Sequence, residues 1–159
     1  MNENLFLMNG VNSDVVKCVR QQYEVWKEQP RELMGDMSGG SVDDICQGIF
    51  GFMIDHVRYK LDPPGIQYIK SPLRLLRDGN GDCKSFTMFI ACCLHVAGVK
   101  HIIRFVNFDG GSQYTHVYPV AIDENGGEII LDACEKDAKG NPIYDYARDY
   151  YKKQDFLYE

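Results

Sequence analysis

One cysteine stands where the chain passes from a glycine-rich turn into a long helical pattern. The turn Gly79-Asn80-Gly81-Asp82 leads directly into Cys83, and an apolar helical pattern then runs on to Gly98. We therefore expect Cys83 in the first turn of a helix, where the positive end of the helix dipole favours a thiolate over a thiol. A thiolate in this position is a nucleophile.

The chain supplies a base and an orienting acid further along. His116 lies in a strand predicted at residues 115–122, and Asp132 lies in the next strand, predicted at 128–133. Side chains alternate along strands, so a hairpin loop of three or five residues would place residue 116 directly opposite residue 132. Cysteine, histidine and aspartate then form a nucleophile, its base and the group that orients the base.

These residue types define the expected chemistry. Cys83 attacks an acyl carbon, His116 holds the thiolate as an ion pair and then protonates the leaving group, and Asp132 fixes the imidazole tautomer. The backbone N–H of Cys83 provides one half of an oxyanion hole. The second donor is not identified by the sequence, and its candidates are Gln67, Tyr68 and Asn80.

The periodicity changes from helical in the first half of the chain to strand-like in the second. Helices followed by antiparallel strands are an α+β arrangement, with the nucleophile helix packed on the sheet. Helices are predicted at 13–29, 41–56, 72–77, 83–97 and 142–153, and strands at 101–108, 115–122 and 128–133. Ser41 and Asp44 have the spacing of a capping box.

Length and charge limit the function classes. The 159 residues suit a single domain, 1–159, and the formal net charge of −6 argues against a nucleic-acid binder. No apolar stretch is long enough for a membrane span or a signal core, so a cytoplasmic protein is expected. The oligomeric state is not predicted. Basic residues cluster before the nucleophile and indicate either solvated faces or a weak preference for an acidic substrate (Arg58, Lys60, Lys70, Arg74, Arg77, Lys84).

The remaining cysteines and histidines are given structural roles. Six cysteines that fall largely inside helical patterns indicate reduced, mostly buried thiols. Cys92 and Cys93 are adjacent on a helix and point about 100° apart, so with His95 they make a poor metal site, and no metal or cofactor is expected. His56 is predicted in the core, and His95 and His101 on the surface.

The motifs around the three central residues resemble the transglutaminase-like superfamily within the papain-like cysteine enzymes. The resemblance covers roughly residues 45–135 and rests on five segments: Gly81-Asp82-Cys83, Leu94–Val99, Arg104–Val106, Thr115–Tyr118 and Ile130–Ala133. It implies a papain-like α+β fold with Cys83 at a helix N-terminus and His116 and Asp132 on the sheet. Two departures stand out: Trp26 is the only tryptophan, and Ala133-Cys134 follows Asp132 where a proline is common.

The function that this resemblance implies is hydrolysis through a thioester, by a cysteine peptidase or amidase acting on a peptide or amide substrate derived from protein. The compact chain lacks the extra domains and calcium sites of animal transglutaminases, which favours hydrolysis over cross-linking. Two alternatives stay open: a non-catalytic binding or assembly module on the same fold, and a transglutaminase-type acyl transferase. Compact members of this kind are similar to bacterial and phage proteins.

Overall fold

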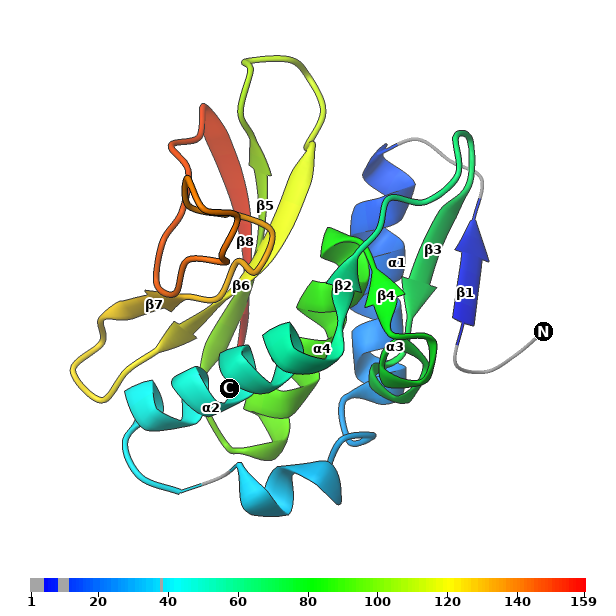
Figure 1. The fold of residues 1–159 in the computed structure, drawn as a ribbon. Coiled ribbons are helices and arrows are strands. Elements are labelled where there is room, and N and C mark those ends of the chain that lie inside the picture. Colours follow the sequence, from blue (N-terminus) through cyan, green and yellow to red (C-terminus); the bar gives the residue numbers. More distant parts are fainter. Residues whose placement is uncertain (1–4, 9–11, 38) are drawn as a thin grey trace.

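A computed structural model describes residues 5–8, 12–37 and 39–159. The described chain is α+β, and its main sheet has four antiparallel strands in the order β7-β6-β5-β8 (Figure 1). The helices are α1 (Asn12–Trp26), α2 (Val42–His56), α3 (Pro72–Asp78) and α4 (Cys83–Val96), with a 3₁₀ helix at Leu33–Asp36. The strands are β1 (Leu5–Met8), β2 (Arg58–Tyr59), β3 (Gln67–Lys70), β4 (Asn80–Gly81), β5 (His101–Asn107), β6 (His116–Ile122), β7 (Glu128–Ile130) and β8 (Lys152–Tyr158).

Helix α4 is the centre of the fold. Every residue from Lys84 to Leu94 is buried, because α4 lies between the sheet on one side and the other helices on the other (Figure 1). The hydroxyl of Thr87 donates to the carbonyl oxygen of Val117 at 3.1 Å, which joins the first turns of α4 to β6 beside His116. A helix buried on all sides has a nearly fixed position, so the residue at its N-terminus is fixed as well.

Short-range sequence signals determine where helices α2 and α3 begin, as expected. Ser41 accepts from the Asp44 N–H while the Asp44 side chain accepts from the Ser41 N–H, so the predicted capping box opens α2. Ser71 caps α3 by accepting the Arg74 N–H, with Pro72 in its first turn. No helix among the described residues has the length and apolar character needed to cross a membrane.

The β6–β7 hairpin differs from its predicted register by two residues. Val120 pairs with Ile130 and Ile122 pairs with Glu128, so residue 116 is not directly opposite residue 132. The loop has five residues, but it spans 123–127 rather than 122–126, and the Asp123 carboxylate accepts the backbone N–H groups of residues 125 and 127 at 2.9 and 2.8 Å. A shift of two residues leaves every side chain on its predicted face, so His116 and Asp132 still share one face.

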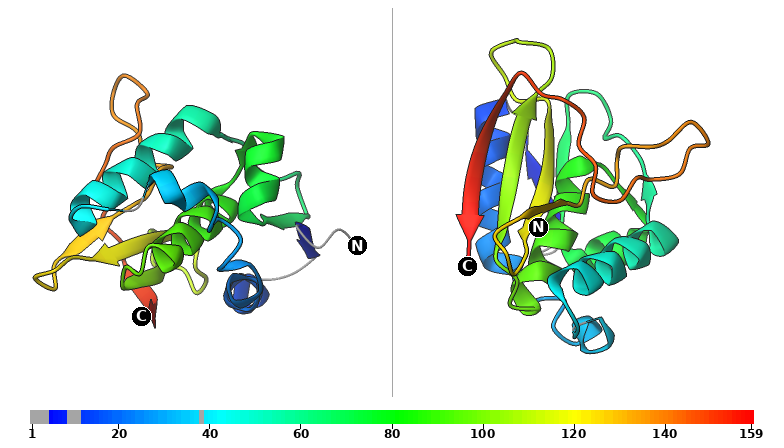
Figure 2. Two further views of the ribbon diagram at one scale, coloured as in Figure 1. Left: turned by 90° about the horizontal axis from the view of Figure 1, so that it is seen from below. Right: turned by 90° about the vertical axis from the view of Figure 1, so that its left-hand side faces the viewer.

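The C-terminal segment was predicted wrongly as a helix at 142–153. Residues 142–151 form turns and irregular backbone, with Asp145 in the left-handed region at φ 54°, and residues 152–158 form β8. β8 pairs with the whole of β5 and occupies an edge of the sheet (Figure 2). Pairing satisfies the backbone groups of β5, which would otherwise form an open edge, and this outweighs the local helical spacing of the tyrosines.

Two histidines also differ from prediction. His56 is exposed and bonds the Phe52 carbonyl oxygen at 2.7 Å, so it is not a core residue. His101 is 1% exposed rather than on the surface, and its ring bonds the Tyr23 hydroxyl at 2.9 Å and the Val99 carbonyl oxygen at 2.8 Å. Burial lowers the pKa of His101 to about 4, so it is a neutral structural residue.

Candidate active site

The N-terminus of α4 places Cys83 at the edge of a pocket. β4 leads into the helix and pairs in parallel with β2, and the Asp82 carboxylate caps the helix by accepting the Lys84 N–H at 3.0 Å. Gly81 is required by close packing, because a Cβ there would lie 2.7 Å from Leu75 Cδ1 and 3.0 Å from Ser85 Cβ. Cys83 itself is partly exposed, whereas residues 84–94 of the same helix are buried.

His116 begins β6 and is held by Asp132. Its Nε2 lies 2.7 Å from Asp132 Oδ2, and the second carboxylate oxygen accepts the Cys134 N–H at 3.1 Å. The Asp132 side chain is 2% exposed and that of His116 is 10% exposed. The imidazole is therefore anchored at Nε2, which leaves Nδ1 as the nitrogen available to another group.

The electrostatic balance at His116 favours the charged ring. Burial by itself disfavours an imidazolium, but the hydrogen bond to Asp132 and the interaction with Cys83 outweigh it and raise the pKa of His116 to about 10. In the described structure, His116 lies next to both Asp132 and Cys83. A charged imidazole beside a thiol is the arrangement that stabilises a thiolate.

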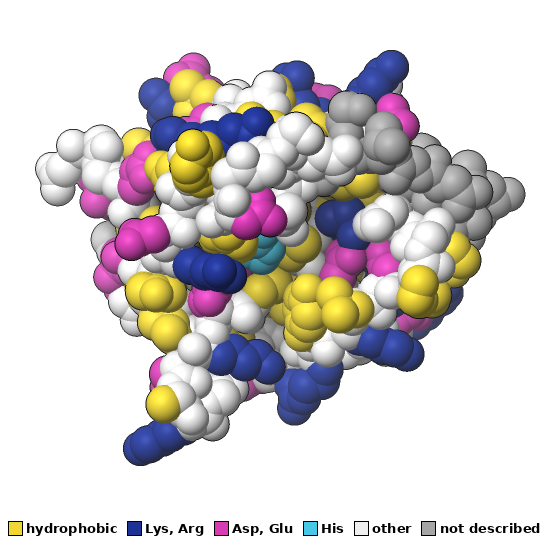
Figure 3. All heavy atoms as spheres, turned by 90° about the horizontal axis from the view of Figure 1, so that it is seen from above, with side chains coloured by type: hydrophobic (Ala, Val, Ile, Leu, Met, Phe, Trp, Pro, Cys, Tyr) yellow, Lys and Arg dark blue, Asp and Glu magenta, His cyan; other side chains and the backbone are white. Residues whose placement is uncertain are grey.

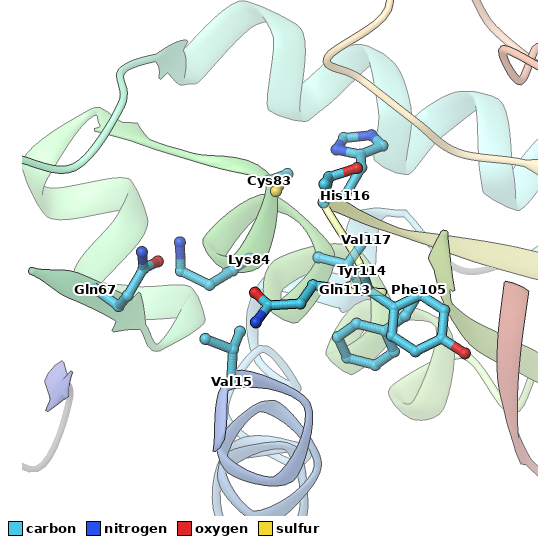
Figure 4. A pocket seen from close by; sticks show the side chains of 10 residues that line it. Val15, Gln67, Cys83, Lys84, Phe105, Gln113, Tyr114, His116 and Val117 are labelled. Atoms are coloured by element: carbon cyan, nitrogen blue, oxygen red, sulfur yellow. The ribbon is translucent and has the colours of Figure 1, made fainter. Parts of the chain in front are cut away.

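Cys83 and His116 open into a cavity of about 500 Å³. Apolar side chains from α1, β5 and β6 line part of it, and the amides of Gln67 and Gln113 point into it from opposite walls (Figure 4). One face of the molecule has a hollow with a histidine at its floor, bordered by hydrophobic side chains and a few basic ones (Figure 3).

Lys84 is a functional neighbour that sequence reasoning missed. The sequence groups Lys84 with a basic cluster, but its side chain is buried, with 6% exposed. Its ammonium group contacts the carboxylates of Asp82 and Asp62, the latter at 3.3 Å. Burial acts to lower the pKa of Lys84, but the nearby negative charges outweigh it and raise that pKa. Asp62 also accepts the Tyr68 N–H at 2.7 Å, so this ion cluster fastens the loop before β3 to the start of α4.

Two other basic residues of the predicted cluster are also paired with a carboxylate. Lys70 lies 3.1 Å and Arg74 lies 2.7 Å from Asp78 Oδ2. For these two residues and Lys84, the interpretation as balanced charges describes the structure. A sequence signal was present, since Arg74 and Asp78 have helical i, i+4 spacing.

Cys134 is the second missed neighbour. Ligand atoms of Cys134, His116 and Asp132 lie within 4.8 Å of one another. Burial, followed by the negative charges of Cys83 and Asp132, raises the pKa of the Cys134 thiol. Its signal in the sequence was the departure from the family pattern directly after Asp132.

The three candidates for the second oxyanion donor differ in their hydrogen bonds and in the cavity that each of them lines. The Asn80 amide group donates to the Asp78 carbonyl oxygen at 3.1 Å, and its side-chain oxygen accepts from Lys70 at 3.3 Å. Asn80 and Tyr68 line a different cavity, next to Pro63 and Pro64. Gln67 is the candidate that lines the same cavity as Cys83 (Figure 4).

Several solved structures have a similar fold. A candidate protease from Parabacteroides distasonis superposes with a TM-score of 0.58 at 14% identity, over 76% of this chain and 25% of that one. A candidate cysteine protease from Cytophaga hutchinsonii gives 0.51 at 11% identity, over 93% and 56%. LapG from Legionella pneumophila gives 0.53 at 20% identity, over 82% and 78%. Neither a protein-family model nor a curated protein sequence matches the chain.

The chain has the papain-like, transglutaminase-like α+β fold of these structures. The α+β arrangement predicted from the sequence is confirmed, with the central helix α4 packed on an antiparallel sheet. This chain spans a quarter and about half of the length of the first two of these proteins. At these identities the likeness describes the fold, and activity is a separate question.

Proposed function

We propose that this chain is a cysteine-dependent hydrolase of peptide or amide bonds, with Cys83 as nucleophile, His116 as acid and base, and Asp132 as the residue that orients His116. The observation that carries the proposal is the position of the His116 imidazole. Its Nε2 lies 2.7 Å from Asp132, and its other side faces Cys83 at the edge of the cavity. The cysteine-protease fold of the structural neighbours supports it.

The reaction proceeds in two halves. The Cys83 thiolate attacks the carbonyl carbon, the C–N bond breaks, and the departing amine takes the proton from His116 Nδ1. A water molecule then loses a proton to the same nitrogen and attacks the thioester, and the C–S bond breaks to regenerate the thiolate. Asp132 stays ionised throughout and keeps Nε2 protonated, which leaves Nδ1 to exchange the proton.

Two groups are proposed to stabilise the oxyanion. The Cys83 N–H is one of the first N–H groups of α4, which have no acceptor within the helix. The Gln67 side-chain amide provides the second N–H from β3, because it points into the cavity that Cys83 borders. Removing one such donor costs roughly 10²–10³-fold in kcat in hydrolases of this type.

The substrate is proposed to be an extended segment of a protein. The cavity combines apolar walls with the amides of Gln67 and Gln113, groups that bind backbone N–H and C=O groups of a peptide. Lys84, the lysine among the lining residues, is paired with Asp62 and Asp82. All six cysteines are free, which fits a reducing compartment such as the cytoplasm.

The test is to incubate wild-type protein and Cys83→Ala with denatured protein mixtures and to identify new termini and deamidated residues by mass spectrometry. Wild-type protein should produce them, Cys83→Ala should not, and Cys18→Ala should match wild type. Products that are equal in wild type and Cys83→Ala contradict the proposal. A labelled primary amine in the same mixture distinguishes acyl transfer, which attaches the label, from hydrolysis, which leaves it free.

A further inference from the structure

The thiol of Cys134 lies beside the proposed catalytic pair and has no part in the proposed reaction. One ligand atom from each of Cys134, His116 and Asp132 lies within 4.8 Å of the other two. Sulfur, imidazole nitrogen and carboxylate oxygen are together the ligand set of Zn²⁺ and of similar ions of borderline softness. This mixed set distinguishes the group from a cluster of surface carboxylates.

These donors are gathered and buried before any ion binds. Asp132 is 2% exposed, the His116 side chain is 10% exposed, and Cys134 is partly buried. The Cys134 N–H donates to Asp132 Oδ1 at 3.1 Å, which fixes the segment carrying the thiol relative to the carboxylate. His116 is fixed from the other side by its place in β6, between the rings of Phe108 and Tyr118 at centroid distances of 5.6 and 5.8 Å.

Three protein ligands leave one coordination position for water, which is the arrangement of an open zinc site. Cys83 faces His116 across the mouth of the cavity (Figure 4) and is not one of the three grouped donors. The Cys134 side of the group is partly exposed, so an ion can reach it from there.

We propose that Cys134, His116 and Asp132 form a three-ligand binding site for Zn²⁺ or an ion of similar softness, with water as the fourth ligand. Binding displaces the Cys134 thiol proton and one ring proton of His116 to solvent, which frees a ring nitrogen of His116 to bind the ion. An engaged Nδ1 is no longer a base for Cys83, and an engaged Nε2 is no longer held by Asp132. The loaded protein is therefore an inactive form, and only this last consequence rests on the proposed function.

The test uses reduced, metal-free protein and the ions alone. Titration with Co²⁺ should produce a sulfur-to-cobalt charge-transfer band, and Zn²⁺ should abolish that band by competition. Cys134→Ala should weaken Zn²⁺ binding by ~10-fold or more, on the scale of losses seen when supporting groups around a metal are removed. Cys18→Ala removes another partly buried thiol that is not among the grouped donors, and should bind as wild type does.

Equal Zn²⁺ affinity in wild type and a folded Cys134→Ala overturns the proposal, as does the lack of the charge-transfer band. If thermal melting shows that Cys134→Ala does not fold, X-ray absorption of the zinc-loaded wild-type protein decides, because the site requires a sulfur ligand and a shell of nitrogen and oxygen alone overturns it. Neither readout needs turnover. A protein that binds zinc but hydrolyses nothing refutes the proposed function alone, and the reverse result refutes the metal site alone.

Discussion

The two ends of helix α4 place the same chemical group in opposite surroundings. Cys83, in the first turn, borders a cavity and faces His116, whereas Cys92 and Cys93, near the other end, are fully buried. Burial raises the pKa of both distal thiols, Cys92 well above its usual value. Position on the helix, rather than residue type, therefore separates a candidate nucleophile from two core residues.

The largest expected effect is on turnover at the first turn. Cys83→Ala should lower amide hydrolysis by ~10³-fold or more, because the covalent route is lost and only binding and oxyanion contacts remain. The measurement is the rate of product formation from a peptide identified in the mixture experiment. A comparable loss of hydrolysis in Cys18→Ala would show that the activity depends on thiols in general. That result would contradict the distinction drawn between Cys83 and the buried cysteines at the other end of α4.

The orienting residue should have the next largest effect. Asp132→Asn should reduce hydrolysis by ~10²–10⁴-fold, since an amide holds His116 in the wrong tautomer. Melting temperature should be measured in parallel, because Asp132 is buried and also accepts the Cys134 N–H. Full activity in a folded Asp132→Asn would contradict the assigned role.

A methyl group added at Gly81, just before the nucleophile, should lower stability, whereas one added at Gly48 in α2 should not. Gly81→Ala should destabilise the protein by ~1–3 kcal/mol, because its Cβ would overlap Leu75 and Ser85. Gly48→Ala is the matched control: it lies in α2 with no atom within 4 Å of its Cβ, and should stabilise by ~0.5–1 kcal/mol. Urea unfolding of both variants measures the difference, and equal effects would refute the packing argument.

The two ends of α4 should also differ in how much a serine substitution lowers the free energy of unfolding. Cys92→Ser should cost ~1–3 kcal/mol, because it buries a hydroxyl where Cys92 is 0% exposed. Cys83→Ser, at a partly exposed position, should cost less than ~0.5 kcal/mol. The free energies of unfolding from urea titrations give the comparison, and a larger loss at Cys83 than at Cys92 would reverse it.

The sequence was sufficient where local signals and tertiary packing agree. The turn into Cys83, the cap at Ser41 and the face shared by His116 and Asp132 all follow from short-range rules. Two features depended on distant partners instead: β5 pairs with β8, and the Lys84 ammonium group pairs in the interior with Asp62. The third difference is local, because the Asp123 side chain stabilises the hairpin loop at 123–127, one residue later than expected.

The position of Lys84 shows why composition misleads at a site. A lysine next to a nucleophile reads as a surface charge, because nothing nearby in sequence except Asp82 predicts its burial. Its second partner, Asp62, lies in a loop between β2 and β3 whose path is set by packing rather than by periodicity. Buried charges are tolerated only when paired, so such a residue becomes visible once the fold brings its partners together.

The central claim is that His116 holds Cys83 as a reactive thiolate, and it is tested most directly by alkylation with iodoacetamide, followed thiol by thiol by mass spectrometry. At pH 6 an ordinary thiol is less than ~1% ionised, so Cys83 should react about 100-fold faster than Cys18 or Cys134. Its rate should change little from pH 6 to 8, since the pKa of His116 is raised to about 10 and the ring stays charged there. His116→Ala should lose this advantage and show a rate that rises with pH. Equal rates at Cys83 and Cys18 in the wild type, or an unchanged rate at Cys83 in His116→Ala, would contradict the account.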